Sequence, residues 1–212
     1  MEIIWPALAA QWGLSEAELA YIDRQQGTTC VNCATSLRSA ALADAIRRHF
    51  GWRRPFQEMF MRRPALATLE INEAGTLTPH LSEWKRHHLA SHPEVDMLDL
   101  PYADKTFDLV VHSDTLEHVT DPVVGLTECH RVLRPGGVLA YTIPLIVGRM
   151  SRPRKGMPAS YHGAEGEDNY LVHTEYGADF WTEPVRAGFG NVSIYPFEFP
   201  AAVAIVAQRG MA

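Results

Sequence analysis

The sequence lacks the features that mark membrane, secreted and disulfide-stabilised proteins. No apolar run approaches the ~20 residues that a membrane-spanning helix needs. Residues 1–8 lack the basic, then apolar, then small-residue order of a signal peptide. Only three cysteines occur among 212 residues, which excludes a disulfide scaffold and agrees with a reducing compartment. We therefore expect a cytoplasmic protein with no membrane partner.

An excess of positive charge is also missing. Nineteen Lys and Arg residues stand against 25 Asp and Glu residues, a net charge of −6 that disfavours attraction to nucleic-acid backbones. The chain also lacks a basic, aromatic platform for single strands. With 46% hydrophobic and 21% charged residues, the composition is that of a globular protein. At ~150 residues per domain, the length predicts one domain with an appendage. The acidic charge balance and the missing platform predict that the protein has no nucleic-acid partner.

The N-terminal part of the chain carries helical signals. Ser15 precedes two glutamates and a run of apolar positions, which predicts a capped helix over residues 15–24. Ser36 can cap a longer helix, in which apolar residues recur at three- and four-residue spacing. We predict that residues 1–62 form a helical cover over the acceptor side of the site, and that residues 63–212 form the main domain.

In the main domain, short apolar runs alternate with helical stretches. These runs comprise residues 65–71, 107–111 and 137–143, followed near the C-terminus by residues 191–195 and 201–206. Asp121 can cap a helix between the second and third runs. The alternation predicts a parallel α/β sheet. The last two runs, separated by a proline-containing turn, predict an antiparallel hairpin.

Polar residues concentrate where one of the predicted strands ends. Ligands bind beyond the carboxyl ends of parallel strands, so we examined the residues after Ile71, Val95 and Val111. The last of these positions is followed by Asp114, Glu117 and His118. Their three- and four-residue spacing predicts that these side chains share one face of a helical turn. They are candidates for catalysis, and the alternative is that Glu117 and His118 serve packing and hydrogen bonding.

A longer series of residues carries a family resemblance. Residues 95–111 read VDMLDLPYADKTFDLVV, residues 116–122 read LEHVTDP and residues 131–137 read RVLRPGG. This ordered series resembles the class I S-adenosylmethionine-dependent methyltransferases, in the branch that methylates small molecules. The resemblance implies a Rossmann-like, doubly wound and mostly parallel sheet of seven strands, with a C-terminal antiparallel hairpin. It also implies S-adenosylmethionine as cofactor and a small-molecule, glycan or lipid acceptor that is methylated at oxygen or nitrogen.

The resemblance assigns donor-binding roles to four residues. Glu70 matches the acid that ends the first strand and organises the methionine end of the donor. Asp96 matches the acid that accepts from the adenine amino group, and the backbone N–H of Met97 would bind the adjacent ring nitrogen. Ser113 lies where a strand-end carbonyl receives the ammonium group of the donor.

The loop after the first strand departs from the family pattern. The family has three alternating glycines there, whereas this chain has Asn72, Ala74 and Thr76, with Gly75 as the remaining glycine. Asn tolerates the left-handed conformation, so the loop could keep its path. The alternative function is a noncatalytic binding protein that retains the methyltransferase fold. The nearest polar candidates for the missing ribose-binding acid are Ser91, His92 and Glu94.

Methyl transfer to a hydroxyl acceptor requires alignment and a base. We predict that His118, supported by Asp114 and Glu117, is this base, because imidazole has a reference pKa of ~6.5. The Asp-x-x-Glu-His pattern is also similar to an element of certain metal-assisted O-methyltransferases. A divalent cation such as magnesium is therefore an alternative, but we do not favour it and assign no metal ligand.

Two further segments carry candidate chemistry. Cys30 and Cys33 could be ordinary buried thiols, which we favour, or a remnant of a zinc knuckle, or a redox pair. Residues 148–175 form a long polar and aromatic insertion that we interpret as a substrate lid, with His162 and His173 as second-rank base candidates. Basic residues at its start either attract an anionic acceptor or are solvated: Arg149, Arg152, Arg154 and Lys155.

Overall fold

A six-stranded sheet organises the chain. The computed structural model describes residues 6–54, 58, 65–161, 170–199 and 201–211, so the predicted boundary at residue 62 lies outside the described residues. The strand order is β2-β1-β3-β4-β9-β8. The strands are β1 (Thr68–Ile71), β2 (His87–Ala90), β3 (Phe107–Ser113), β4 (Leu133–Thr142), β8 (Asn191–Phe197) and β9 (Ala202–Gln208).

The sheet has the predicted mixture of directions. Strands β2, β1, β3 and β4 run parallel, and β9 and β8 add an antiparallel hairpin beside β4. This confirms the α/β fold class. The expectation of seven strands was wrong for the described residues, because the segment between β2 and β3 consists of turns. Val95 therefore lies in a turn, and the second strand ends earlier, at Ala90.

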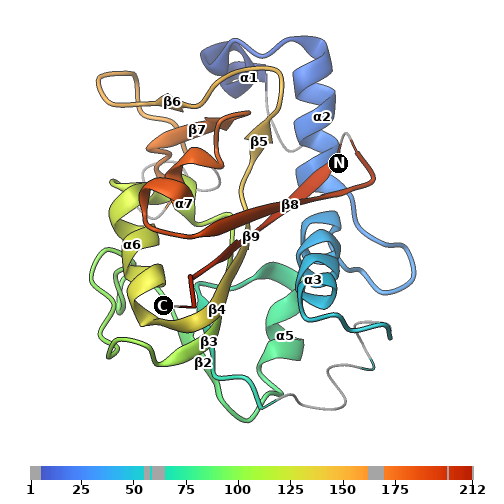
Figure 1. Cartoon of the computed structure of the whole chain (residues 1–212). Helices are drawn as coiled ribbons and strands as arrows, with labels where there is room; N and C mark the ends of the chain where they lie inside the picture. Colours follow the sequence, from blue (N-terminus) through green and yellow to red (C-terminus); the bar gives the residue numbers. More distant parts are fainter. Residues whose placement is uncertain (1–5, 55–57, 59–64, 162–169, 200, 212) are drawn as a thin grey trace.

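Helices cover both faces of this sheet (Figure 1). One face packs against α3 (Leu37–His49) and the short α5 (Thr78–Leu81), the other against α6 (Pro122–Val132) and α7 (Thr182–Arg186). Ser36 caps α3 and Asp121 caps α6 through side-chain bonds to backbone N–H groups, as predicted. Because α3 shares one core with β4 and β9, the N-terminal part of the chain is built into the main domain.

Two more N-terminal helices form a smaller core. They are α1 (Pro6–Trp12) and α2 (Glu16–Gly27), and the latter starts with a complete capping box between Ser15 and Glu18. Their buried faces pack against Ile146 and Val172. The helix predicted from Ser15 is therefore confirmed, and it extends beyond the expected residue 24.

The predicted lid segment, residues 148–175, contributes to a small second sheet. Its strands are β5 (Leu145–Ile146), β6 (Arg152–Pro153) and β7 (Thr174–Gly177), in the order β5-β7-β6. The N-terminal helices hold this segment, since Trp12 Nε1 donates to Ser160 Oγ at 2.8 Å and Arg149 pairs with Glu18. Residues 162–169, including the candidate base His162, lie outside the described residues.

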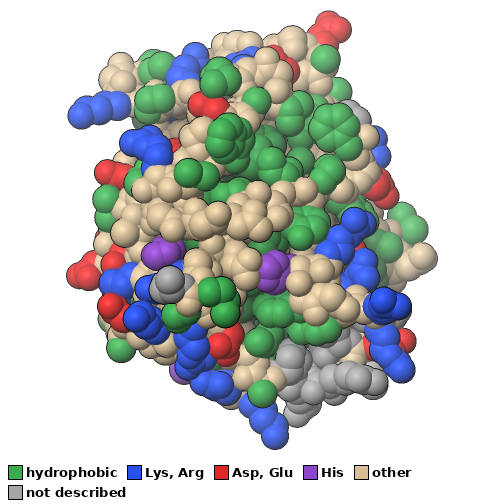
Figure 2. All heavy atoms as spheres, in the orientation of Figure 1, with side chains coloured by type: hydrophobic (Ala, Val, Ile, Leu, Met, Phe, Trp, Pro, Cys, Tyr) green, Lys and Arg blue, Asp and Glu red, His purple; other side chains and the backbone are tan. Residues whose placement is uncertain are grey.

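The surface shows a mixed distribution of side chains. Figure 2 shows hydrophobic side chains gathered over the upper half of one face, with Lys and Arg side chains mainly towards its edges. The edge strand β8 contributes Ile194, which is exposed. Among the described residues, no helix has the length and apolar character that crossing a membrane requires.

Candidate active site

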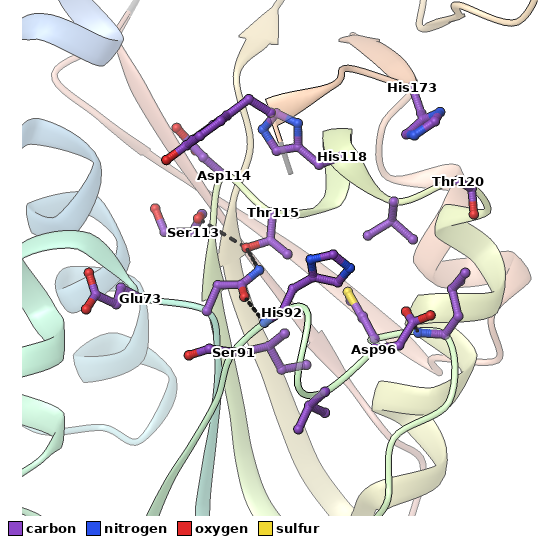
Figure 3. Close-up of a pocket in the computed structure, with 17 residues that line it drawn as sticks. Glu73, Ser91, His92, Asp96, Ser113, Asp114, Thr115, His118, Thr120 and His173 are labelled. Atoms are coloured by element: carbon purple, nitrogen blue, oxygen red, sulfur yellow. Dashed lines mark hydrogen bonds between the residues drawn. The ribbon is translucent and has the colours of Figure 1, made fainter. Parts of the chain in front are cut away.

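A cavity of about 590 Å³ lies at the carboxyl ends of β1, β2 and β3 (Figure 3). Its polar lining includes Asn72, Glu73, Ser91, His92, Asp96, Ser113, Asp114, Thr115, His118 and His173. Of the predicted donor-binding residues, Asn72, Asp96, Met97 and Ser113 line this cavity. The predicted Glu70 and Gly75 lie outside its lining.

Asn72 ties the ends of three strands together. It has the left-handed backbone conformation that a glycine usually adopts at this point of the loop, with φ of 54°. Its Oδ1 accepts from the His92 N–H at 2.9 Å, and its Nδ2 donates to Thr115 Oγ1 at 3.4 Å. Gly75 also has a positive φ, and it faces α3, where a Cβ would lie 3.0 Å from Ser39 Oγ. The loop therefore keeps a tight path without the glycine series.

Glu70 supports this loop from behind. Its side chain is fully buried, and Oε1 accepts from the Ala74 N–H at 2.8 Å and from the Thr78 hydroxyl at 2.6 Å. Its other oxygen lies 2.6 Å from His87 Nε2. Strand β2 places the His87 side chain against Glu70, where 8% of it is exposed.

The loop after β2 presents a matched acceptor and donor at the rim of the cavity. Asp96 is exposed, and one of its oxygens accepts from the Leu98 N–H at 2.9 Å. The backbone N–H of Met97 makes no hydrogen bond to any described residue. A carboxylate beside an unused backbone N–H suits a ligand edge that carries a donor next to an acceptor.

Helix α6 fixes the position of this loop. Glu128 Oε2 accepts from the Leu100 N–H at 2.9 Å, and Arg131 donates to the carbonyls of Leu100 and Tyr102. Arg131 also pairs with Glu128 and lowers the pKa of that carboxyl. Glu128 and Arg131 therefore fix the end of the loop that carries Asp96.

An arginine from α3 reaches the strand-end turn. The Arg38 guanidinium forms an ion pair with Asp114, whose backbone has a positive φ of 47°. Thr142 Oγ1 also donates to Asp114, at 3.3 Å. Burial lowers the pKa of Arg38, and the nearby Glu117 opposes that shift. Sequence reasoning missed Arg38, because its partners are distant in the chain and no local pattern connects them.

Glu117 lies deeper than the other two candidate catalytic residues. Neither of its carboxyl oxygens has a hydrogen-bond partner among the described residues, and 1% of the residue is exposed. Burial raises the pKa of Glu117 to about 8, against the opposing charge of Arg38. Burial therefore favours the protonated form of this carboxyl. Within the described part of the chain, no three His, Cys, Asp or Glu side chains converge as metal ligands.

A hydrogen bond to the backbone fixes the tautomer of His118. Its Nδ1 lies 3.0 Å from the Leu171 carbonyl, which can only accept, so Nδ1 carries the hydrogen and Nε2 carries the lone pair. Glu117 Oε1 lies 3.6 Å from Nε2. Burial lowers the pKa of His118, and it also lowers that of His173, to which the nearby His118 contributes. Figure 3 shows both imidazoles along one side of the cavity, with Asp96 further along its wall.

Cys30 and Cys33 lie away from this cavity. Both are exposed, so the favoured expectation of buried thiols was wrong. The loop that carries them is closed by a bridge between Thr29 and Ser36, which leaves the two side chains at the surface. Cys33 Sγ lies 3.2 Å from Thr35 Oγ1, and hydrogen bonding with Thr35 lowers the pKa of Cys33.

Comparisons with known proteins agree with this placement. Residues 74–141 match the methyltransferase domain family. A probable S-adenosylmethionine-dependent methyltransferase of Mycolicibacterium smegmatis is 40% identical over 63 residues, which cover 27% of this chain and 24% of that protein. A ubiquinone biosynthesis O-methyltransferase of Cereibacter sphaeroides is 34% identical over 67 residues, 32% of this chain and 25% of that protein.

Among solved structures, an S-adenosylmethionine-dependent methyltransferase from Mesorhizobium loti aligns with 82% of this chain and 100% of its own. The two chains are 15% identical, and the TM-score is 0.46. The chain spans about a quarter of the length of the two curated relatives named above. The aligned family segment includes the Asp96 loop and the turn that carries His118.

Proposed function

From the match of residues 74–141 to the methyltransferase domain family, we propose that the chain is a class I S-adenosylmethionine-dependent methyltransferase that transfers a methyl group to a small molecule. The acceptor would be methylated at oxygen or nitrogen, on a free small molecule or on a glycan or lipid. The matched relative that is named an O-methyltransferase supports oxygen. The donor would occupy the cavity at the carboxyl ends of β1, β2 and β3.

The observation that carries this proposal is the pairing of Asp96 with the unused N–H of Met97. Adenine presents an amino donor beside a ring-nitrogen acceptor, and these two protein groups match that edge in the same order. Glu128 and Arg131 bind the backbone of Leu100, three residues after Met97 on the same loop. The residues of the cavity therefore fit S-adenosylmethionine as the cofactor.

The remaining residues provide orientation and proton transfer. Bound S-adenosylmethionine supplies an electrophilic methyl group on a sulfonium, which is a good leaving group. His118 Nε2 would accept the proton from the acceptor hydroxyl or amine. Glu117 Oε1 lies 3.6 Å from this nitrogen and would stabilise the positive charge that the imidazole gains with the proton. Asp114 would act indirectly, because its ion pair with Arg38 fixes the turn that carries His118.

The two carboxyl groups next to His118 do not support the metal-assisted alternative. Asp114 is paired with Arg38, and Glu117 is buried with a raised pKa. A hard cation needs ionised oxygen ligands that converge on one point. We therefore propose that His118 accepts the proton and that no metal ion takes part.

Calorimetric titration with S-adenosylhomocysteine tests the proposal, followed by turnover assays with S-adenosylmethionine and hydroxyl or amine acceptors. We expect binding with one site per chain, and S-adenosylhomocysteine as the product. Absence of heat and of a thermal shift at millimolar ligand would refute the donor assignment. Binding without turnover on any acceptor would favour the noncatalytic alternative, a binding protein that retains the fold.

A further inference from the structure

We infer that a second cavity beside the first binds the acceptor, and that it selects an acceptor carrying a phosphate or carboxylate group. This inference rests on the proposed function, because the second cavity matters for catalysis only if the first holds the donor. The anion would bind to Lys155 and Arg186, which line the second cavity from opposite elements.

The two cavities meet at a common wall. The second cavity has a volume of about 680 Å³ and lies between residues 151–159, the start of β7, the N-terminus of α6 and α7. Thr120 and His173 line both cavities. Leu171 lines the second cavity, and its carbonyl accepts the hydrogen bond from His118, which lines the first. An acceptor in the second cavity would therefore reach the base at the junction.

Most of the basic residues near this cavity are already used within the fold. Arg149 pairs with Glu18, and both Arg152 and Arg154 pair with the buried Glu175. The expectation that these three arginines attract an acceptor is therefore not supported by their contacts. Lys155, the fourth residue of that group, has no hydrogen bond or ion pair to any described residue.

Arg186 supplies the second unpaired cation. It lies in α7, is exposed, and makes no hydrogen bond or ion pair to the described residues. Arg154 adds a buried guanidinium to the lining, and its Nε has no hydrogen-bond partner among the described residues. An arginine and a lysine facing one cavity are typical of a site for phosphate or carboxylate.

The two acids among the described lining residues are engaged by other groups. Asp121 is the cap of α6, where its Oδ1 accepts from the Val124 N–H at 3.2 Å. Glu183 accepts a hydrogen bond from the Tyr176 hydroxyl at 2.8 Å, and burial raises the pKa of this carboxyl. The N-terminus of the 11-residue α6 adds a partial positive charge. Within the described lining, Lys155 and Arg186 therefore have no ion-pair partner.

Apolar side chains complete the lining. Met157, Pro158, Leu171 and Val172 provide a surface for the body of an acceptor, while the cations fix one end of it. During transfer, the C–S bond of the sulfonium breaks as a bond forms between the methyl carbon and the acceptor oxygen or nitrogen. The acceptor proton moves to His118 Nε2, which leaves a neutral thioether and an anionic methylated product.

Binding of simple probes tests the inference. We would titrate phenyl phosphate, benzoate and neutral phenol into the protein, with and without saturating S-adenosylhomocysteine. The test variant is Lys155→Gln/Arg186→Gln, and the control is Arg53→Gln/Lys85→Gln, which removes two exposed cations that line neither cavity. We expect both anions to bind more tightly than phenol, and the test variant to lose about tenfold in anion affinity.

The same variant should bind S-adenosylhomocysteine as the wild type does. Equal affinity for phenol and phenyl phosphate, or an equal loss in the control variant, would overturn the inference. Preference for one anion over the other would show whether phosphate or carboxylate is the better match. If the wild type does not bind S-adenosylhomocysteine, the proposed function is refuted, whether or not phenyl phosphate and benzoate bind.

Discussion

The two cavities differ in the charged side chains that line them. The charged residues in the described lining of the first are the acids Glu73, Asp96 and Asp114, whereas the second has the cations Arg154, Lys155 and Arg186 together with Asp121 and Glu183. A sulfonium donor with an ammonium group suits the first, and an anionic acceptor suits the second. Between them lie two imidazoles whose pKa values burial lowers, so the junction is uncharged at neutral pH. This difference in charge is the basis of our proposal that the donor binds in the first cavity and an anionic acceptor in the second.

The two cavities are also built from different parts of the fold. The first cavity is formed by the ends of three parallel strands and the turns that follow them. Hydrogen bonds of the Asn72 side chain link these strand ends. The second depends on residues 151–159 and on α7, which are held by contacts that reach back to α1 and α2. Changes in the first should alter donor binding, whereas changes in the second should alter acceptor binding alone.

The largest effect should follow a change at the junction. His118→Ala should lower the rate with a given acceptor by ~10²–10⁴, because the proton acceptor is removed. Donor affinity, measured calorimetrically, should stay intact. Chelators should leave the wild-type rate unchanged. A rate that vanishes with chelator and returns with magnesium would instead identify a cation held by Asp114 and Glu117, and unchanged turnover in His118→Ala would make His173 the next candidate.

A smaller effect should follow a change in the first cavity. Asp96→Ala should weaken S-adenosylhomocysteine binding by ~1.5–3 kcal/mol, since a charge-assisted hydrogen bond to the adenine amino group is lost. Asp99→Ala is the matched control, because Asp99 is also exposed on this loop but does not line the cavity. Equal affinities in the two variants would place the adenine elsewhere.

The ion pair that supports the first cavity should contribute to stability. Arg38→Met leaves Asp114 without its partner in a mostly buried position, which should cost on the order of 1–3 kcal/mol in the free energy of unfolding. Urea denaturation measures this, and Asp114→Asn added to Arg38→Met should recover part of the loss. If the double variant loses as much free energy of unfolding as Arg38→Met and Asp114→Asn lose together as single variants, the two residues are not coupled.

Stability should also depend on pH. Because burial raises the pKa of Glu117 to about 8, the folded chain keeps a proton that the unfolded chain releases above its ordinary pKa. Stability should therefore fall as pH rises from about 4.5 to 8, by on the order of 4–5 kcal/mol over the whole interval. Glu117→Gln should flatten this part of the profile. The same slope in both proteins would show that Glu117 is ionised in the folded state.

Local signals in the sequence predicted the helices well. Ser15, Ser36 and Asp121 each cap a helix as expected, because a capping bond involves residues only two or three positions apart. Strand β2 was missed for a physical reason. It lies at the edge of the sheet, and its two histidines, His87 and His88, hide the apolar pattern that marks a buried strand.

The candidate site was predictable only in part. The turn from Ser113 to His118 and the loop at Asp96 are continuous segments, and both line the cavity as placed from the sequence. The contact of Arg38 and the burial that raises the pKa of Glu117 depend on how α3 packs against the sheet. No local pattern encodes such packing, so these features required the structure.

A crystal structure with S-adenosylhomocysteine and phenyl phosphate would test the arrangement of the two cavities most directly. Our account predicts adenine against Asp96 and the Met97 N–H, sulfur facing His118 and His173, and phosphate between Lys155 and Arg186. An adenosine that lies outside the first cavity, or a phosphate bound away from the wall that Thr120 and His173 share, would contradict it.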